Sequence, residues 1–515
     1  MLLFLLVAAA YAPVTRAGFI WDDPQYVVDN PLLRTWEGLW SIWTRPTSGA
    51  HQWYPLTLTT FWLEYQAWGL HPLGYHVVNV LLHAASACLV FCVCRRLRVP
   101  GALLVAALFA VHPVHVESVA WVTELKNVLS GFFSLMSVLC FLRFVDGRRV
   151  SWRAYAAALA CFASALLSKS VASTVPAALP LVLWASGRRV TRRTWLGLLP
   201  MFALGLAMAA ITVHVEHTGV GARGPEWDLA PVARFVIAGR ALWFYVGKLM
   251  WPADLCFSYA RWEVGSVTLA DTWPLAAAVV VVLAAFAARR RVGRWPVAAL
   301  CYFGGTLLPA LGFINVYPMR YTFVADHYPY AASLGVLALF AGVAVAVARR
   351  AAGGPVRLAR SPAWVFLVGG LLAVLVGSTA SRTLVYRDEL ALWTDTVEKN
   401  PAAYHARTNL GVQLAAAGDG DGAAAQFRAA ARLRPDLAWP LNNLGLLQAT
   451  AGDLDGAERS YRAALAREPD LPQVHYNLGL VLLRQGRAAE AQQAFRAALA
   501  RDPAHPGARA HLEDR

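Results

Sequence analysis

Charged residues are scarce in this chain of 515 residues. They make up 15% of the sequence, whereas hydrophobic residues make up 58% and the mean hydropathy is +0.45. A soluble domain of ordinary composition carries roughly 25% charged residues. The scarcity of charge therefore excludes an ordinary soluble protein and predicts a protein with many membrane spans.

Cysteine is also scarce, with seven residues, and all except Cys256 lie within apolar stretches. Outside those stretches no paired or metal-like spacing occurs. Disulfide and thiol redox chemistry are therefore not expected, and we interpret the cysteines as packing residues.

Acidic residues are fewer than basic ones, 31 against 46, and the net charge is +15. Such a charge is often a sign of nucleic-acid binding, but here the basic residues form five short clusters between apolar runs. The clusters are Arg95, Arg96 and Arg98; Arg148, Arg149 and Arg153; Arg188, Arg189, Arg192 and Arg193; Arg289, Arg290, Arg291 and Arg294; and Arg349, Arg350, Arg357 and Arg360. This is the positive-inside pattern, so the charge indicates topology and no nucleic-acid partner is expected.

Apolar runs suited to spanning helices number eleven. They lie near 2–19, 72–94, 101–113, 127–145, 154–168, 170–186, 195–213, 272–288, 295–313, 329–348 and 362–380. A chain that starts inside then has all five arginine clusters on the cytoplasmic side. The further apolar stretch from Phe235 to Trp251 is expected to lie in the interface or to re-enter, because a crossing there would reverse the fourth cluster. We interpret the opening segment as a first span whose start codon is placed late, since it has only a poor cleavage site for a signal peptide.

The predicted topology defines the domains. A membrane domain of residues 1–381 has outer loops at 20–71, 112–126, 214–271 and 314–328, followed by a connecting helix at 382–403, repeats at 404–505 and a tail at 506–515. Seven tryptophans in 20–71 predict helices lying in the interface, suited either to a long-chain lipid or to an ordinary aromatic belt.

The C-terminal part repeats every 34 residues. The repeated positions are Pro401, Pro435, Pro469 and Pro503; Gly418, Gly452 and Gly486; the Asn-Leu-Gly triplets that begin at Asn409, Asn443 and Asn477; and the aromatics Phe427, Tyr461 and Phe495. This is the tetratricopeptide signature, in which each unit is a helix–turn–helix. The predicted fold class is all-α, a polytopic membrane bundle of about eleven spans followed by an α-solenoid.

The three repeat asparagines share one position on the first helix of each unit. A row of amides there suits the backbone of an extended peptide. The alternative is that this asparagine accompanies Leu-Gly in this repeat subtype without touching a ligand.

Candidate catalytic carboxylates lie where apolar runs end. Asp22 and Asp23 follow the first run, and a charge pair at a membrane surface is costly unless it serves a site. Glu117, in the run from His112 to Glu117, is a third candidate. The alternatives are a solvated loop for the pair and a capped helix terminus for Glu117. A zinc site at His112, His115 and Glu117 is disfavoured, because the spacing lacks the helical HExxH arrangement.

Isolated cations on the predicted outer face form a second set. Positive residues on that side favour an anionic partner such as a lipid phosphate, although a single one often only snorkels to headgroups. The set comprises Lys126, Lys169, Lys248 and Arg320, with His327 in the last outer loop. His76, Asn79 and His83 share one helix face and are interpreted as residues that link helices.

Several motifs together resemble one family. They are Phe19 to Tyr26 with Asn30-Pro31, His76 to His83, His112 to Glu117, Glu124 to Asn127, Tyr245 to Pro252, and Phe323 to His327. In this order, and followed by the repeats, they resemble the bacterial relatives of the transmembrane and tetratricopeptide repeat-containing protein O-mannosyltransferases. The resemblance covers nearly the whole chain.

The resemblance implies an inverting GT-C glycosyltransferase of the bacterial inner membrane, metal-independent and without a cofactor. Its donor is a sugar on a polyprenyl-phosphate carrier and its acceptor a hydroxyl of an exported protein, which the periplasmic repeats present. Asp22 or Asp23 is the expected base, with Glu117 orienting the acceptor, and Lys126, Lys169, Lys248, Arg320 and His327 are the expected phosphate-binding residues. Two alternatives are glycosylation of an envelope lipid or glycan, with the repeats recruiting a partner, and a non-enzymatic repeat scaffold.

Overall fold

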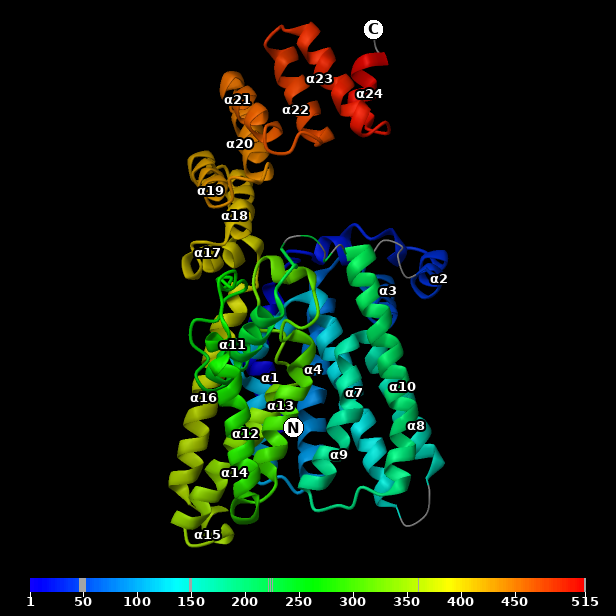
Figure 1. Ribbon diagram of the computed structural model, residues 1–515, viewed down its shortest axis with the longest axis vertical. Helices are drawn as coiled ribbons and strands as arrows, with labels where there is room; N and C mark the ends of the chain where they lie inside the picture. Colours follow the sequence, from blue (N-terminus) through cyan, green and yellow to red (C-terminus); the bar gives the residue numbers. More distant parts are fainter. Residues whose placement is uncertain are drawn as a thin grey trace. The chain divides into compact units, whose positions relative to one another are not determined.

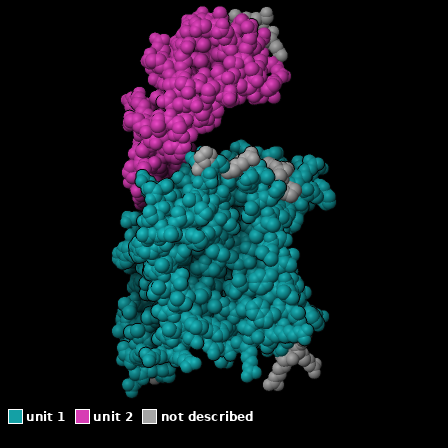
Figure 2. Space-filling model, in the orientation of Figure 1, with its two compact units in different colours: residues 1–388 teal, residues 389–515 magenta. Residues whose placement is uncertain are grey.

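The computed structural model describes residues 1–45, 52–147, 151–220, 222, 224, 226–359 and 361–513. Within these ranges helices are the only regular elements, so the predicted all-α fold class is confirmed. The chain divides into two compact units, residues 1–388 and 389–515, which Figure 2 colours separately. The boundary lies inside the segment 382–403 that the sequence predicted as a connection.

Unit 1 is a bundle of long helices (Figure 1). Six of the described helices are long and apolar enough to cross a membrane, judged by length and composition. They are built on α4 (Pro72–Arg96), α7 (Leu125–Asp146), α10 (Arg192–Val215), α12 (Trp273–Val292), α14 (Ser333–Ala351) and α16 (Pro362–Val385). A seventh candidate is the bent pair of α5 (Ala102–Val111) with η4 (Pro113–His115) and α6 (Val116–Ala120), whose axes differ by 51°.

Shorter apolar helices occupy the four remaining predicted positions. They are α1 (Leu2–Tyr11) with η1 (Ala12–Arg16), α8 (Trp152–Ser168), η6 (Ser170–Thr174) with α9 (Val175–Ala185), and α13 (Trp295–Leu307) with η9 (Leu308–Ala310). All eleven predicted apolar runs are therefore helical, but only six or seven have the length of a span. Four runs differ because proline or a polar turn ends each helix early, which hydropathy alone does not register.

The candidate spans expose a large apolar surface, whose contact with water would be unfavourable. Only 6% of the most apolar window of α12 and 11% of that of α16 is buried within the chain. Val280 is 62% exposed and Phe366 is 79% exposed. Continuous apolar surface of this length matches the hydrocarbon core of a bilayer, and the chain is a multi-pass membrane protein.

Arginine clusters from separate loops meet one another. Asp146 pairs with Arg96 at 3.2 Å and with Arg188 at 3.0 Å. Arg294 donates to the Trp184 carbonyl at 3.2 Å. Three of the five clusters thus lie together, as the predicted topology requires.

Shorter elements and α11 complete unit 1. α11 does not meet the criteria for a span, in line with the expectation for the stretch from Phe235 to Trp251. In Figure 1 α15 lies at the end of the unit opposite to α2 and α3. The bounds are η2 (Pro24–Val28), η3 (Pro31–Leu33), α2 (Trp36–Thr44), α3 (Pro55–Trp68), η5 (Val122–Glu124), η7 (Glu216–Val220), α11 (Pro231–Met250), η8 (Leu269–Thr272), η10 (Tyr317–Arg320) and α15 (Pro355–Ala359).

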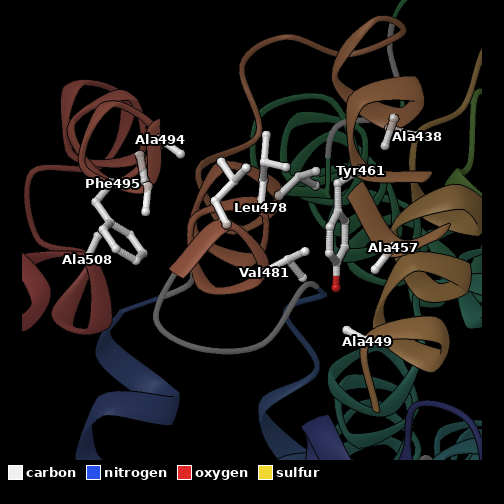
Figure 3. Close-up of a cluster of buried hydrophobic side chains, with 14 residues drawn as sticks. Ala438, Ala449, Ala457, Tyr461, Leu478, Val481, Ala494, Phe495 and Ala508 are labelled. Carbon is white, nitrogen blue, oxygen red and sulfur yellow. The ribbon is translucent and has the colours of Figure 1, made fainter. Parts of the chain in front are cut away.

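Unit 2 is a solenoid of helix pairs, and it confirms the predicted tetratricopeptide repeats. Its helices are α17 (Glu389–Lys399), α18 (Tyr404–Ala416), α19 (Gly420–Leu433), α20 (Trp439–Thr450), α21 (Leu454–Leu465), α22 (Pro472–Arg484), α23 (Ala488–Arg501) and α24 (Pro506–Glu513). The three repeats are α18 with α19, α20 with α21, and α22 with α23. In Figure 3 Tyr461 stands between Ala457 on its own helix and Val481 of the next repeat.

A glycine fixes the distance between the two helices of each repeat. A Cβ atom placed on Gly411, Gly445 or Gly479 would lie 2.6, 2.8 or 2.5 Å from the ring of Phe427, Tyr461 or Phe495, respectively. Each ring is buried and has no room to withdraw. The aromatic position and the glycine of the Asn-Leu-Gly triplet therefore form one packing contact, repeated three times.

Replacing Gly445 with alanine is expected to destabilise unit 2 by about 1–3 kcal/mol, because the methyl group overpacks the Tyr461 ring. Hydrogen–deuterium exchange on the purified full chain measures this as faster exchange in α20 to α22. Gly420→Ala is the matched control, since nothing lies within 4 Å of its Cβ position. Equal exchange in the two variants would contradict the assignment.

Candidate active site

Asp23 ties the segment after η1 to the break before α7. Its carboxylate is fully buried and accepts three hydrogen bonds, from the Ile20 amide at 2.9 Å, the Thr123 amide at 2.8 Å and the Thr123 hydroxyl at 2.6 Å. Burial, together with the nearby charge of Asp22, raises the pKa of Asp23 to about 8. Asp23 is thus a protonatable brace that holds two distant segments together.

Asp22 is left less satisfied than its neighbour. One carboxylate oxygen, Oδ1, is buried and has no hydrogen-bond partner among the described residues. Burial raises the pKa of Asp22 to about 6, and the positive charge of Lys126 opposes this rise. The two adjacent acids therefore have separated pKa values, and near pH 7 the ionised one is Asp22.

Glu124 is the centre of a buried ion cluster. Its Oε1 lies 3.0 Å from the Lys126 ammonium and its Oε2 lies 3.1 Å from the Lys169 ammonium. All three side chains are at least four-fifths buried. Burial lowers the pKa of Lys169 to about 8, against the pull of Glu124. We call these three residues the Glu124 cluster.

The Glu124 cluster adjoins Asp22. Lys126 lies over the rings of Tyr26 and Trp121, at 5.6 and 5.7 Å, and its charge acts on Asp22. The structure therefore brings Asp22, Asp23, Lys126 and Lys169 together, as the sequence predicted for one site. Sequence reasoning gave Glu124 no role. The available signal was a glutamate two residues from Lys126 at a break in an apolar run, where a buried cation needs a counter-charge.

Glu117 belongs to a second buried group. Its Oε1 lies 2.7 Å from His327 Nδ1, while Oε2 is buried with no partner among the described residues. The Asn127 amide donates to the His327 carbonyl at 3.0 Å. The neighbouring Asp326 accepts a hydrogen bond from the Tyr259 hydroxyl at 2.8 Å, and burial plus the charge of Glu117 raise its pKa to about 7. We call Glu117, Asp326 and His327 the Glu117 cluster.

The two clusters are neighbours. The Trp121 ring, which lies beneath Lys126, meets the His327 ring edge-on at 6.0 Å. The sequence predicted that Glu117 lies near Asp22 and Asp23. The contact of Trp121 with His327 places one aromatic ring between the Glu117 cluster and the Glu124 cluster, which adjoins Asp22.

The other predicted cations have local partners. Lys248 donates to the carbonyls of Ala253 and Asp254, at 2.7 and 3.0 Å, and its charge acts on Asp326. Arg320 instead forms an ion pair with Glu226 at 3.2 Å and donates to the Tyr317 hydroxyl at 2.9 Å. Lys248 thus borders the Glu117 cluster, whereas the contacts of Arg320 are with a different part of unit 1.

Of the three residues interpreted as structural, His83 links α4 to α5, whereas Asn79 and His76 link α4 to connecting segments. His83 contacts the Tyr330 hydroxyl at 2.9 Å and the Ala110 carbonyl at 3.1 Å. Asn79 donates to the Trp121 carbonyl at 3.2 Å, and His76 lies 3.3 Å from the Gly18 carbonyl. Among the described residues no group of three or more His, Cys, Asp or Glu side chains is arranged to hold a metal ion.

In unit 2 the repeat asparagines are half-buried. Asn477 donates to Asn442 at 3.1 Å, and Asn442 donates to Asn443 at 3.3 Å, so two of the predicted positions join one amide chain. Asn409 occupies the same position on α18. Sequence reasoning missed Asn442, which the 34-residue period does not mark because Thr408 and Tyr476 stand at the equivalent positions.

These features define a class, a multi-pass membrane protein with buried acid–lysine clusters and a C-terminal tetratricopeptide solenoid. A tetratricopeptide repeat family model matches residues 386–438 and 442–506. Solved repeat structures also match in part. YrrB, described as a TPR protein with an unusual peptide-binding site, has a TM-score of 0.23 and 18% identity over 34% of this chain and 87% of its own. MamA has a TM-score of 0.23 and 17% identity over 24% and 75%.

Curated relatives identify the neighbouring family. Protein O-mannosyl-transferase Tmtc1 of Drosophila melanogaster is 35% identical over 33% of this chain and 21% of its own length. Protein O-mannosyl-transferase F38B6.6 of Caenorhabditis elegans is 26% identical over 54% and 41%, and human TMTC4 is 37% identical over 24% and 20%. The chain is therefore related to the animal protein O-mannosyl-transferases, which confirms the resemblance drawn from its motifs. It matches between a fifth and two fifths of the length of these relatives.

Replacing Asp23 with asparagine is expected to lower the unfolding midpoint of unit 1. An amide NH₂ group then faces backbone donors, and a lost buried hydrogen bond costs about 1–3 kcal/mol. Thermal unfolding of the purified full chain measures the change. Asp22→Asn is the control, since it removes a buried charge whose Oδ1 makes no hydrogen bond, and its midpoint should be unchanged or raised. Equal falls in both variants would refute the distinction between the two acids.

Proposed function

We propose that the protein is a membrane glycosyltransferase that moves a sugar from a polyprenyl-phosphate carrier to a hydroxyl of an exported protein. The observation that carries the proposal is the buried contact zone of Asp22 with the Glu124 cluster, where a base and two cations meet. The relationship to protein O-mannosyl-transferases supports the reaction type. The bacterial inner membrane and an outward-facing site remain part of the proposal.

Asp22 is the proposed base. It has a buried oxygen without a partner and a pKa of about 6, so it is ionised at neutral pH and ready to accept a proton. Asp23 has its oxygens occupied by three donors and a pKa of about 8, so it is the positioning residue. The choice between the two acids, open in the sequence, is thereby made on hydrogen bonding.

The Glu124 cluster is the proposed phosphate site. Two ammonium groups share the Glu124 carboxylate, and when Asp22 takes up a proton one of their positive charges is left for a phosphate oxygen. Glu124 fixes both lysines before the donor binds, and this avoids reorganisation during the reaction. Lys248 and His327 border the same region, whereas Arg320, held by Glu226, is not assigned to the phosphate.

The reaction is a single displacement. The acceptor oxygen forms a bond to the anomeric carbon, its proton passes to Asp22, and the bond from that carbon to the phosphate oxygen breaks. The electron pair leaves with the polyprenyl phosphate, which Lys126 and Lys169 stabilise. Attack opposite the leaving group inverts the sugar carbon. The unpartnered oxygen of Glu117 is the proposed contact that orients the acceptor.

Asp22→Asn is expected to reduce transfer by about 100-fold or more, because a general base typically contributes that much. Glu117→Gln is expected to reduce transfer by a similar factor of about 100, because a misplaced acceptor reacts more slowly. Mass spectrometry of glycans on envelope proteins and lipids, in strains carrying each variant at normal expression, measures the loss. Asp29→Asn is the matched control, an exposed carboxylate in the same segment. With the wild-type enzyme, transfer should rise as pH increases through about 6, since Asp22 must be ionised. Full modification by Asp22→Asn would support the scaffold alternative instead.

The triple variant Asn409→Ala, Asn443→Ala and Asn477→Ala is expected to lose modification of proteins while the membrane unit stays folded, because the repeats are proposed to hold the acceptor backbone. Gln493→Ala, an exposed amide on α23, is the control. Glycoproteomics of the envelope fraction gives the readout. If lipid or glycan modification persists and protein modification was never present, the envelope-glycan alternative replaces protein transfer.

A further inference from the structure

An open groove lined by aromatic rings lies at the start of α12. Its volume is about 320 Å³, and its lining residues come from α11, the loop after it and the first turn of α12: Arg240, Trp243, Phe244, Trp262, Trp273 and Pro274. Ligand sites typically have volumes of about 300–1,000 Å³, so the groove suits a head group and the first part of a chain.

Close packing of two helices shapes the groove. Gly239 allows α11 to approach α12, since a Cβ atom there would lie 2.5 Å from the Leu275 nitrogen. Trp243 donates from its indole nitrogen to the Pro274 carbonyl at 2.8 Å, and this fixes one wall. Trp243 is 42% exposed and Trp273 is 68% exposed, so their ring faces remain available.

Arg240 places one positive charge in this apolar setting. Its half-buried guanidinium makes no hydrogen bond or ion pair with any residue that the structure describes. The charge of Arg240 acts on Asp271, and that carboxylate already accepts from the Thr268 amide at 2.7 Å and the Thr268 hydroxyl at 2.9 Å. The guanidinium is therefore free to bind an anion, and its forked donors match phosphate oxygens.

The groove opens where a lipid is found. α12 is a candidate span with most of its apolar surface exposed, and its far end carries Arg289, Arg290 and Arg291. Arg240 and Trp273 thus lie near the start of α12, at the membrane interface opposite to the one that holds Arg289, Arg290 and Arg291. A chain leaving the groove meets the exposed side of α12, where Val280 is 62% and Leu283 is 59% exposed.

One wall of the groove continues into the candidate active site. The Phe244 ring packs edge-on against Tyr259 at 4.8 Å, and the Tyr259 hydroxyl donates to Asp326 of the Glu117 cluster. Phe244, in the wall of the groove, and Tyr259 behind it therefore connect the groove to the Glu117 cluster.

We propose that this groove is a docking site for a polyprenyl phosphate, which binds its phosphate on Arg240 and its first isoprene units against Trp243, Trp262 and Trp273. This inference rests on the proposed function for the identity of the lipid. A negative phosphate next to a flat apolar chain complements one unpaired guanidinium among indole rings. The groove shares no residue with the Glu124 cluster, so it is a docking position separate from the phosphate site proposed for the reaction.

Direct binding tests the proposal without requiring sugar transfer. The full chain in nanodiscs is titrated with a long-chain polyprenyl phosphate, with the matching polyprenol and with phosphatidylglycerol, and the bound lipid is counted by native mass spectrometry. Arg240→Gln is expected to weaken polyprenyl phosphate binding about tenfold, the equivalent of one charge-assisted hydrogen bond. Arg240→Lys should recover part of the loss, and Trp273→Ala should weaken the polyprenol and the phosphate alike.

Arg289→Gln, at the far end of α12, is the matched control and should bind as the wild type does. Equal binding of polyprenol and polyprenyl phosphate would overturn the phosphate contact, and equal sensitivity of phosphatidylglycerol to Arg240→Gln would replace the proposal with an ordinary phospholipid site. If Arg240-dependent polyprenyl phosphate binding persists but deletion strains keep all their glycans, the proposed function fails and the docking site stands.

Discussion

The compensation of buried charge at Glu124 is the constraint on which the rest of unit 1 depends. A carboxylate or ammonium group taken out of water alone costs several kcal/mol even after relaxation. Glu124, Lys126 and Lys169 avoid that cost by meeting within 3.1 Å. Because Lys169 follows α8, while Glu124 ends η5 and Lys126 lies in the first turn of α7, the ion cluster fixes how α7 and α8 meet. The break between α6 and α7 is required for the same reason, since a continuous helix would not direct Glu124 and Lys126 to the same place.

The acidic pair extends the same constraint to the beginning of the chain. Asp23 joins the segment after η1 to Thr123, next to Glu124, through two hydrogen bonds, and a third from the Ile20 amide holds its carboxylate within its own segment. Asp22 then lies within the field of Lys126 with one oxygen unsatisfied. A buried acceptor without a donor is unfavourable in the free protein, so it suggests a position prepared for a hydroxyl of a bound molecule. Glu117 resembles Asp22 in this respect, since His327 contacts its Oε1 while its buried Oε2 has no partner among the described residues.

The sequence predicted the structure where a repeat period, or the free-energy cost of placing a charge near lipid, specified it. It did not predict contacts between residues that are distant in the chain. The period of 34 predicted the repeats because each glycine must receive an aromatic ring, as at Gly445 and Tyr461. The cost of charge in lipid pointed to Asp22, Glu117 and Lys126. It did not reveal Glu124, whose two partners are set by tertiary contacts, and it grouped Arg320 with the lysines although Glu226 holds it elsewhere. Nor did it find the Arg240 groove, because Gly239, Trp243 and Pro274 meet only when α11 packs on α12.

Charge balance also gives the proposed mechanism an order of events. With Asp23 protonated near pH 7, the carboxylates of Asp22 and Glu124 balance the ammonium groups of Lys126 and Lys169, and the resting site is neutral. When Asp22 takes the acceptor proton, the site gains one positive charge at the moment the leaving phosphate gains one negative charge. The base and the phosphate site thus act through one electrostatic balance, since each step compensates the other in a region that excludes water. The raised pKa of Asp22 favours this coupling, because Asp22 then holds the acceptor proton firmly enough that the charges of Lys126 and Lys169 can act on the leaving phosphate.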